Sequence, residues 1–190
     1  EMCIRDRYPG ECRSDSCADP AVWKSGGCEA FSGSAEASSG ICGGSREGDR
    51  NMNICIYGAS SAELKKIYYE KTEELGRMMG KRGHGLVFGG GKEGLMGATA
   101  RGVDRENGYI LGIAPRFFDQ PGVLYEHCTE FIFTENMRER KHLLESRSDA
   151  TIVVPGGIGT YEEFFEILTL KSLGRIDRPI VLYNICLLYT

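Results

Sequence analysis

The stretch VVPGGIGTYEEF, residues 153–164, combines two kinds of group that do chemistry. Three glycines after an apolar run let backbone N–H groups approach an anionic ligand. A helix capped by Thr160 would also aim its unpaired N–H donors and the positive end of its dipole at that ligand. This arrangement favours a phosphate monoester. Glu162 and Glu163 follow directly, and because carboxylates repel anions they must serve another part of the ligand or none.

Glu163 also has a purely structural interpretation. The run from Thr160 to Glu163 fits the capping box Thr-x-x-Glu, in which the glutamate side chain accepts a hydrogen bond from the N–H of the capping threonine. Such a cap stabilises a helix by about 1 kcal/mol and carries out no chemistry. Spacing alone leaves both interpretations open.

A second cluster lies in ENMRERKHLLE, residues 135–145. It places Arg138, Arg140 and Lys141 in the first turns of an expected helix, where positive charges oppose the helix dipole. Arg140 and Lys141 are adjacent and therefore point about 100° apart around the helix axis. One interpretation is a solvated basic face. The other is an anionic ligand near the helix start, and the glycine-rich loop elsewhere in the chain favours it.

The elements that must position these residues can be read from residue 52 onward. Apolar runs ending in glycine indicate buried strands, and amphipathic segments closed by cations and glycine indicate helices. The expected strands are 53–58, 86–91, 109–115, 130–134, 150–157 and 178–184, and the expected helices are 62–82, 95–107, 136–147 and 161–173. This alternation predicts an α/β fold, a Rossmann-like three-layer sandwich with a parallel sheet flanked by helices.

In such sheets ligands bind beyond the carboxyl ends of the strands. Three glycine-rich loops fall there: residues 58–61, 89–97 and 155–160. The middle loop formally fits the dinucleotide pattern Gly89-x-Gly91-x-x-Gly94. It follows the second strand rather than the first, however, and no acidic residue after the next strand is placed to hold an adenosine ribose. We therefore disfavour NAD binding, and we leave Gly94 and Gly97 open between ligand contact and close helix–strand packing.

Composition narrows the classes of partner. The chain has 190 residues and a net charge of −4. It contains no basic block, which disfavours a nucleic-acid partner. No stretch approaches the roughly 18 consecutive apolar residues of a membrane span. Residues 1–51 are rich in Ser and Gly without helical or strand period, so we expect a disordered or non-native leader. We expect one domain at 52–184 and a non-native tail at 185–190.

Cysteine usage points to a reducing compartment. Five of the eight cysteines lie in the leader without a Cys-x2-Cys pair, which disfavours a zinc site. The remaining Cys55, Cys128 and Cys186 are far apart in the sequence. They predict isolated reduced thiols of a cytoplasmic protein.

Three motifs in combination, GGGKEGLMG, MRERK and PGGIGTYEEFFEILTLKSLG, resemble the Lonely Guy family. These are the cytokinin riboside 5'-monophosphate phosphoribohydrolases, which often carry the label lysine decarboxylase. The resemblance covers residue 52 to about residue 184. It implies a Rossmann-like homodimer that hydrolyses the N-glycosidic bond of an adenine-type nucleoside 5'-monophosphate, such as a cytokinin riboside monophosphate or AMP. The products would be the free base and ribose 5-phosphate, with no metal or organic cofactor.

The resemblance also assigns the site. The family's catalytic arginine and glutamate fall on Arg140 and Glu163. Its phosphate loop falls on Gly156 to Thr160, with Lys141 beside it, and Met137 lies where the family lines the base pocket. The full set of expected substrate contacts is Ser60, Gly91, Met137, Lys141, Gly156, Gly157, Ile158, Gly159, Thr160, Glu162 and Thr169.

The chain departs from the family pattern at several positions. Ile158 stands where an aromatic residue is usual, Arg138 where a histidine is usual, and Leu170 where a tryptophan is usual. A glutamate expected after the third strand has no clear counterpart, which leaves the identity of the base open. The helices that the family carries after the last strand are absent, so we expect a C-terminally truncated domain.

The implied chemistry gives each group a role. Breaking the C1′–N9 bond builds positive charge on the ribose, which the Glu163 carboxylate would stabilise while activating the attacking water. Arg140 would hold Glu163 ionised. Lys141 and the loop amides would anchor the phosphate.

Two alternatives remain. A nucleotide or molybdopterin carrier of the same fold would bind without hydrolysis, but it has no need of both Arg140 and Glu163. A decarboxylase would need a lysine that forms a Schiff base with pyridoxal phosphate. We disfavour it, because Lys92 and Lys171 lack a recognisable context for one.

Overall fold

The computed structural model describes residues 51–185. The predictions of a leader and a tail therefore fall outside the described residues, apart from Asn51 and Ile185. The elements are β1 (Asn53–Tyr57), α1 (Lys66–Lys81), β2 (Gly85–Phe88), α2 (Gly94–Asp104), β3 (Ile110–Pro115), the short helix η1 (Arg116–Phe118), β4 (Glu130–Thr134), α3 (Met137–Ser146), β5 (Ala150–Val153), α4 (Ile158–Ser172) and β6 (Ile180–Leu182).

The six strands form one parallel sheet in the order β4-β3-β2-β1-β5-β6. The described part of the chain enters the sheet at the central strand β1 and continues through β2 and β3 to β4 at one edge. It then crosses back through α3 to pair β5 with β1, where Tyr57 lies opposite Val153. This crossover brings α3 next to α4. The predicted α/β fold with a parallel sheet is confirmed.

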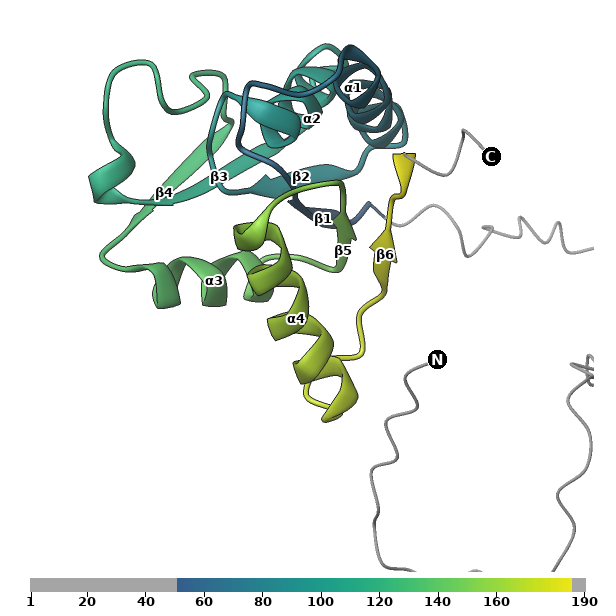
Figure 1. Cartoon of the computed structure of the whole chain (residues 1–190), viewed down its shortest axis with the longest axis vertical. Coiled ribbons are helices and arrows are strands. Elements are labelled where there is room, and N and C mark those ends of the chain that lie inside the picture. Colours follow the sequence, from purple (N-terminus) through teal and green to yellow (C-terminus); the bar gives the residue numbers. More distant parts are fainter. Residues whose placement is uncertain (1–50, 186–190) are drawn as a thin grey trace, which may run out of the picture. The chain divides into compact units, whose positions relative to one another are not determined.

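Helices cover both faces of the sheet, with α1 and α2 on one face and α3 and α4 on the other (Figure 1). Successive side chains of each strand point to opposite faces of the sheet and therefore pack alternately against the two helix layers. In β1, Ile54 and Ile56 belong to the core under α1 and α2, whereas Cys55 and Tyr57 belong to the core under α3 and α4. Tyr57 is thereby placed at the carboxyl end of a central strand, facing α4.

Several element boundaries differ from the sequence prediction, among them the ends of β2 and β5, which lie at Phe88 and Val153 rather than at residues 91 and 157. The first helix begins at Lys66 rather than near residue 62, because the chain is still extended at Lys65. The last strand shortens to Ile180–Leu182. α4 begins at Ile158, three residues before the predicted start.

No helix within residues 51–185 is long and apolar enough to cross a membrane.

Candidate active site

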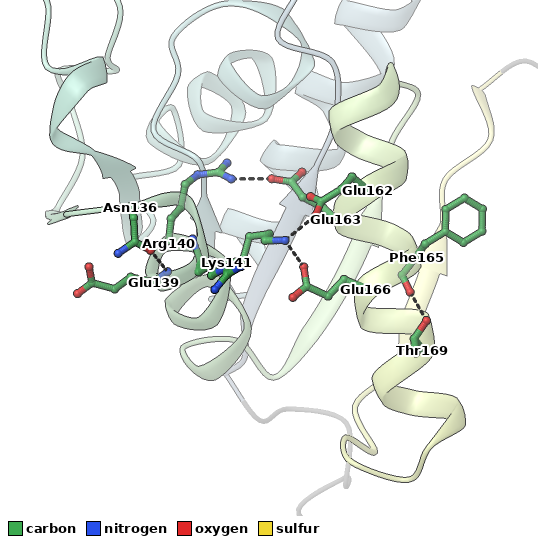
Figure 2. A network of polar contacts seen from close by, with 10 residues as sticks. Asn136, Glu139, Arg140, Lys141, Glu162, Glu163, Phe165, Glu166 and Thr169 are labelled. Carbon is green, nitrogen blue, oxygen red and sulfur yellow. Dashed lines mark hydrogen bonds and ion pairs between the residues drawn. The ribbon is translucent and has the colours of Figure 1, made fainter.

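Arg140 and Glu163 form a buried ion pair between α3 and α4. Arg140 Nη1 donates to Glu163 Oε1 at 2.7 Å, and both side chains are about nine-tenths buried. Figure 2 shows the two side chains pointing toward each other from their separate helices. The interpretation of Arg140 as part of a solvated basic face is therefore wrong. Buried charges are expensive unless paired, so this pair marks a site where charge itself is needed or tolerated.

The cap interpretation of Glu163 is also wrong. The N-cap of α4 is Gly157, no side chain caps this end, and the Glu163 carboxylate binds Arg140 instead. Thr160 lies inside the first turn and is buried. Because the helix begins at Ile158, the first bond of the helical ladder is donated by Tyr161 to Gly157 O. The N–H groups of Ile158, Gly159 and Thr160 precede it, so they are the unpaired donors of this helix start.

The start of α4 and the glycine before it are open to a ligand. Gly157 and Gly159 have no neighbouring atom within 4 Å of the position that a Cβ would occupy. Ile158 is 87% exposed. The N–H donors and the positive end of the helix dipole can therefore be reached by an anion such as a phosphate.

Burial affects the pKa of the Glu163 carboxyl more strongly than Arg140 does. Loss of solvent raises the pKa of the Glu163 carboxyl above its usual range, and the charge and hydrogen bond of Arg140 oppose that rise without cancelling it. The expectation that Arg140 holds Glu163 ionised therefore needs correction. Arg140 favours the ionised form, but the carboxyl still takes up a proton more readily than an exposed glutamate does.

Lys141 bridges α3 to α4 through two further carboxylates. Its Nζ lies 2.5 Å from Glu162 Oε1 and 2.6 Å from Glu166 Oε2 (Figure 2). These two partners raise the pKa of Lys141, so the ammonium stays charged. Lys141 and Glu162, both expected to contact substrate, thus contact each other in this structure.

A cavity of about 300 Å³ lies between α3 and α4. Charged side chains of α3 and a mixed face of α4 line it, and Tyr57 of β1 completes it. The lining residues are Tyr57, Arg138, Lys141, His142, Glu145, Glu163, Glu166, Ile167 and Leu170. Glu163 therefore faces the cavity as well as binding Arg140.

The other expected contacts divide into two groups. Ser60 follows the end of β1, Gly91 follows β2, and Met137 opens α3 with 42% of its surface exposed. Strand ends gather these residues at the carboxyl edge of the sheet. Thr169 lies apart from them: its hydroxyl donates to Phe165 O at 2.7 Å. Figure 2 shows Thr169 and Phe165 on the side of α4 that faces away from Lys141.

The loop of residues 89–97 owes two of its glycines to packing. A Cβ at Gly94, which has φ +66°, would lie 2.1 Å from Ala59 O, and a Cβ at Gly97 would lie 1.8 Å from Lys92 O. Of the two interpretations left open for Gly94 and Gly97, close backbone packing is the correct one.

Sequence reasoning missed three participants. Gly89 lies against the Arg140 guanidinium, Tyr57 borders the cavity beside Glu163, and Glu166 holds Lys141. The spacing of Glu166, one helical turn after Glu163, was the available signal, since residues three apart share a helix face. Nothing in the sequence pairs residue 57 or residue 89 with the second half of the domain.

The two buried groups beneath Glu163 stay protonated. Burial raises the pKa of the Cys55 thiol to about 12 and raises the pKa of the Tyr57 hydroxyl well above its ordinary value. Cys55 is therefore not a nucleophile at neutral pH. Cys55 and Cys128 are free thiols, as expected, and Cys186 lies outside the described residues.

The lysines considered for a Schiff base have other surroundings. Lys171 Nζ donates to Asp177 O at 3.1 Å and to Arg178 O at 2.9 Å, beyond the end of α4. Neither Lys171 nor Lys92 lines the cavity. Within residues 51–185, no cluster of three or more His, Cys, Asp or Glu side chains is arranged to hold a metal ion.

Known proteins resemble this chain in sequence. A family model described as possible lysine decarboxylase matches residues 96–189. A cytokinin riboside 5'-monophosphate phosphoribohydrolase of Arabidopsis thaliana is 35% identical over 136 residues, which are 72% of this chain and 60% of that relative. The chain thus spans less than two thirds of the plant relative's length. A protein of the same name from Mycobacterium tuberculosis is 37% identical over 134 residues, covering 70% of this chain and 71% of that protein.

A solved structure shares the fold. The molybdenum cofactor carrier protein of Chlamydomonas reinhardtii superposes with a TM-score of 0.58 over 70% of this chain and 76% of that one. Its sequence identity is 24%, so the likeness concerns the fold alone. The sequence matches, together with the motifs around Arg140 and Glu163, establish the family. This chain belongs to the cytokinin riboside 5'-monophosphate phosphoribohydrolases.

Proposed function

We propose that this chain is an N-glycosyl hydrolase that releases the base from an adenine-type nucleoside 5'-monophosphate, either AMP or a cytokinin riboside monophosphate. The observation that carries the proposal is the buried Arg140–Glu163 pair beside a glycine-rich helix start. The names of the relatives support the substrate class.

The phosphate and the ribose of such a substrate need opposite charges. The start of α4, exposed at Gly157, Ile158 and Gly159, offers unpaired N–H donors to the phosphate. Glu163 lies in the next turn of α4, where its carboxylate can stabilise the positive charge that develops on the ribose as the C1′–N bond breaks. The combination of glycines and glutamates in one turn therefore matches the two ends of one substrate.

In the proposed reaction, the oxygen of one water bonds to C1′ while the C1′–N bond breaks. The bonding electrons stay on the base nitrogen, which takes up a proton from solvent, and Glu163 returns its own acquired proton to solvent at the end of the cycle. The water's proton passes to Glu163, whose raised pKa makes it a stronger base than an exposed glutamate. Arg140 keeps the carboxylate oriented through its hydrogen bond to Oε1.

We also propose that two copies of the chain associate through the outer face of α4. Tyr161, Phe165 and Leu168 are 56%, 57% and 40% exposed on this face, and the rings of Tyr161 and Phe165 stack on each other. Val181 and Leu182 continue the exposed apolar surface on β6. Light scattering of the purified chain would give its mass in solution, and a monomer would contradict this part of the proposal.

The deciding experiment is to incubate the full chain with AMP and follow free adenine by chromatography, alongside Glu163→Gln. We expect adenine and ribose 5-phosphate from the unsubstituted chain. Turnover by Glu163→Gln should be at least roughly 100-fold slower, which is the lower range of what a general base contributes. Tight AMP binding without release of adenine would instead favour a nucleotide carrier. Full turnover by Glu163→Gln would rule out the catalytic assignment of Glu163.

A further inference from the structure

We propose that the cavity between α3 and α4 delivers the attacking water to Glu163 and that the Tyr57 hydroxyl positions that water. The inference rests on the proposed function, because it concerns the hydrolytic step. It assigns a role to the cavity that residues of both motifs line and to Tyr57, which lies in neither motif.

The first observation is that water has access to the Glu163 carboxylate. The Glu163 side chain is only 10% exposed, and Arg140 occupies its Oε1. The carboxylate nevertheless lines a cavity of about 300 Å³. Since a liquid water takes up about 30 Å³, this space has room for several water molecules in contact with Glu163.

The second observation is the polarity of the residues that line the cavity. A buried water needs roughly two to four hydrogen-bond partners. Tyr57, 3% exposed, and Glu163 line the cavity together, and Lys141 and Glu166 supply further polar groups from its two helical walls. Burial keeps the Tyr57 hydroxyl protonated, and this hydroxyl shares a hydrogen bond with the Cys55 sulfur, so its oxygen is the atom that can accept a hydrogen bond from a water.

The third observation is the direction in which the cavity extends from Glu163. The proposed phosphate site lies at the start of α4, around Gly157 to Thr160, whereas the cavity extends along α4 from Glu163 to Leu170, away from the helix start. A nucleotide whose phosphate occupies the loop would close the carboxyl edge of the sheet to solvent. The cavity reaches Glu163 from another side, so water could still arrive while the substrate is bound.

The step itself balances as ordinary hydrolysis. The water held between Tyr57 and Glu163 gives its proton to Glu163 and its oxygen to C1′. The C1′–N bond breaks with its electron pair on the base, which takes a proton from solvent, and Glu163 later releases the proton that it accepted to solvent. Tyr57 undergoes no net change, so it is a positioning residue rather than a catalytic one.

The test fills the cavity without touching the loop. Leu170 lines the cavity and is half-buried, so Leu170→Trp should occupy part of the space. Leu173→Trp is the matched control, because Leu173 is 66% exposed and does not line the cavity. We expect Leu170→Trp to lower kcat by roughly 10- to 100-fold, a share of what general-base catalysis contributes. The Kd for AMP, measured by calorimetry, should not change, and Leu173→Trp should leave both quantities unchanged.

Tyr57→Phe provides the second variant, since it removes one hydroxyl and conserves the ring. It should lower kcat with the Kd for AMP unchanged, whereas a purely structural role would alter the melting temperature and not kcat alone. An unchanged kcat in both variants overturns the water route. A raised Kd for AMP in Leu170→Trp also overturns it, because the cavity would then hold the nucleotide. If the unsubstituted chain releases no adenine, it is the proposed function that fails, and the cavity assignment falls with it.

Discussion

Gly89 and Arg140 are in direct steric contact across the sheet edge. A Cβ at Gly89 would lie 2.4 Å from Arg140 Nη2, closer than any real contact allows. The glycine at the end of β2 therefore makes room for the guanidinium that reaches Glu163. One residue of the middle glycine-rich loop thus serves the ion pair of the second half of the domain.

Gly89→Ala should impair activity while leaving the fold in place. The atom that must move is the far end of a flexible side chain, so we expect Arg140 to shift and its hydrogen bond to Glu163 to lengthen. Turnover of AMP should fall by roughly tenfold or more, because misplaced catalytic groups lose rate steeply. Thermal unfolding followed by circular dichroism should show little change. Gly91→Ala is the comparison for thermal unfolding only, since a Cβ there meets nothing within 4 Å but Gly91 is itself an expected substrate contact. Full activity of Gly89→Ala would contradict the positioning role.

The titration of Glu163 gives a prediction on stability. Its pKa is raised in the folded protein, so the folded state binds the proton more tightly than the unfolded chain does. The contribution of Glu163 to stability is therefore fully present below its ordinary carboxyl value of 4.5 and is lost as pH rises through the folded pKa. Glutamine does not titrate. The free energy of unfolding of the wild type relative to Glu163→Gln, measured by urea titration, should fall as the pH rises above the ordinary carboxyl value. A difference that rises with pH would mean that Arg140 outweighs burial.

How much of this site the sequence could predict depends on the range of each interaction. The parallel sheet follows from local period and turn signals, and the strand order brings the glycine-rich loops to one edge. The Arg140–Glu163 bond joins residues 23 apart on two helices, and its existence depends on how α3 crosses back over the sheet. No local pattern encodes that crossing. The motif resemblance identified both residues, but not the contact between them.

The start of α4 shows where a local rule failed for a physical reason. Threonine is a better N-cap than most residues, so Thr160 was the natural choice. Glycine is also an accepted N-cap, and the chain uses Gly157. The shift of three residues moves Glu163 into the second turn. There its side chain is directed at α3 rather than back at the cap.

Asn136 is expected to fix the start of α3 and with it the direction of Arg140. Its Oδ1 accepts from the N–H groups of Arg138 and Glu139 at 3.1 and 3.0 Å. Asn136→Ala should lower the free energy of unfolding by about 0.5–2 kcal/mol, the usual range for loss of an N-cap. Asn136→Asp, which conserves the acceptor, is the matched control and should lose much less. Urea titration measures both, and equal losses in the two variants would argue against capping as the cause.

Lys141 provides a test of phosphate anchoring, because its ammonium is held by Glu162 and Glu166 in this structure. A phosphate that binds Lys141 must compete with these carboxylates. Glu166 is 45% exposed, so its ion pair contributes on the order of 1 kcal/mol or less. Glu166→Gln should therefore tighten AMP binding by up to roughly fivefold, the same energy expressed as a ratio of Kd values. Lys141→Met should weaken AMP binding.

Adenosine is the matched ligand for this test, since it carries the same base and ribose without the phosphate. If Lys141 anchors the phosphate, the Kd for adenosine should stay unchanged in both variants while the Kd for AMP moves in opposite directions. Calorimetric titration of both ligands into both variants measures the four values. Equal changes for adenosine and AMP would assign Lys141 to holding α3 against α4. The phosphate would then depend on the N–H donors of Ile158, Gly159 and Thr160, which carry the partial positive charge of the α4 start.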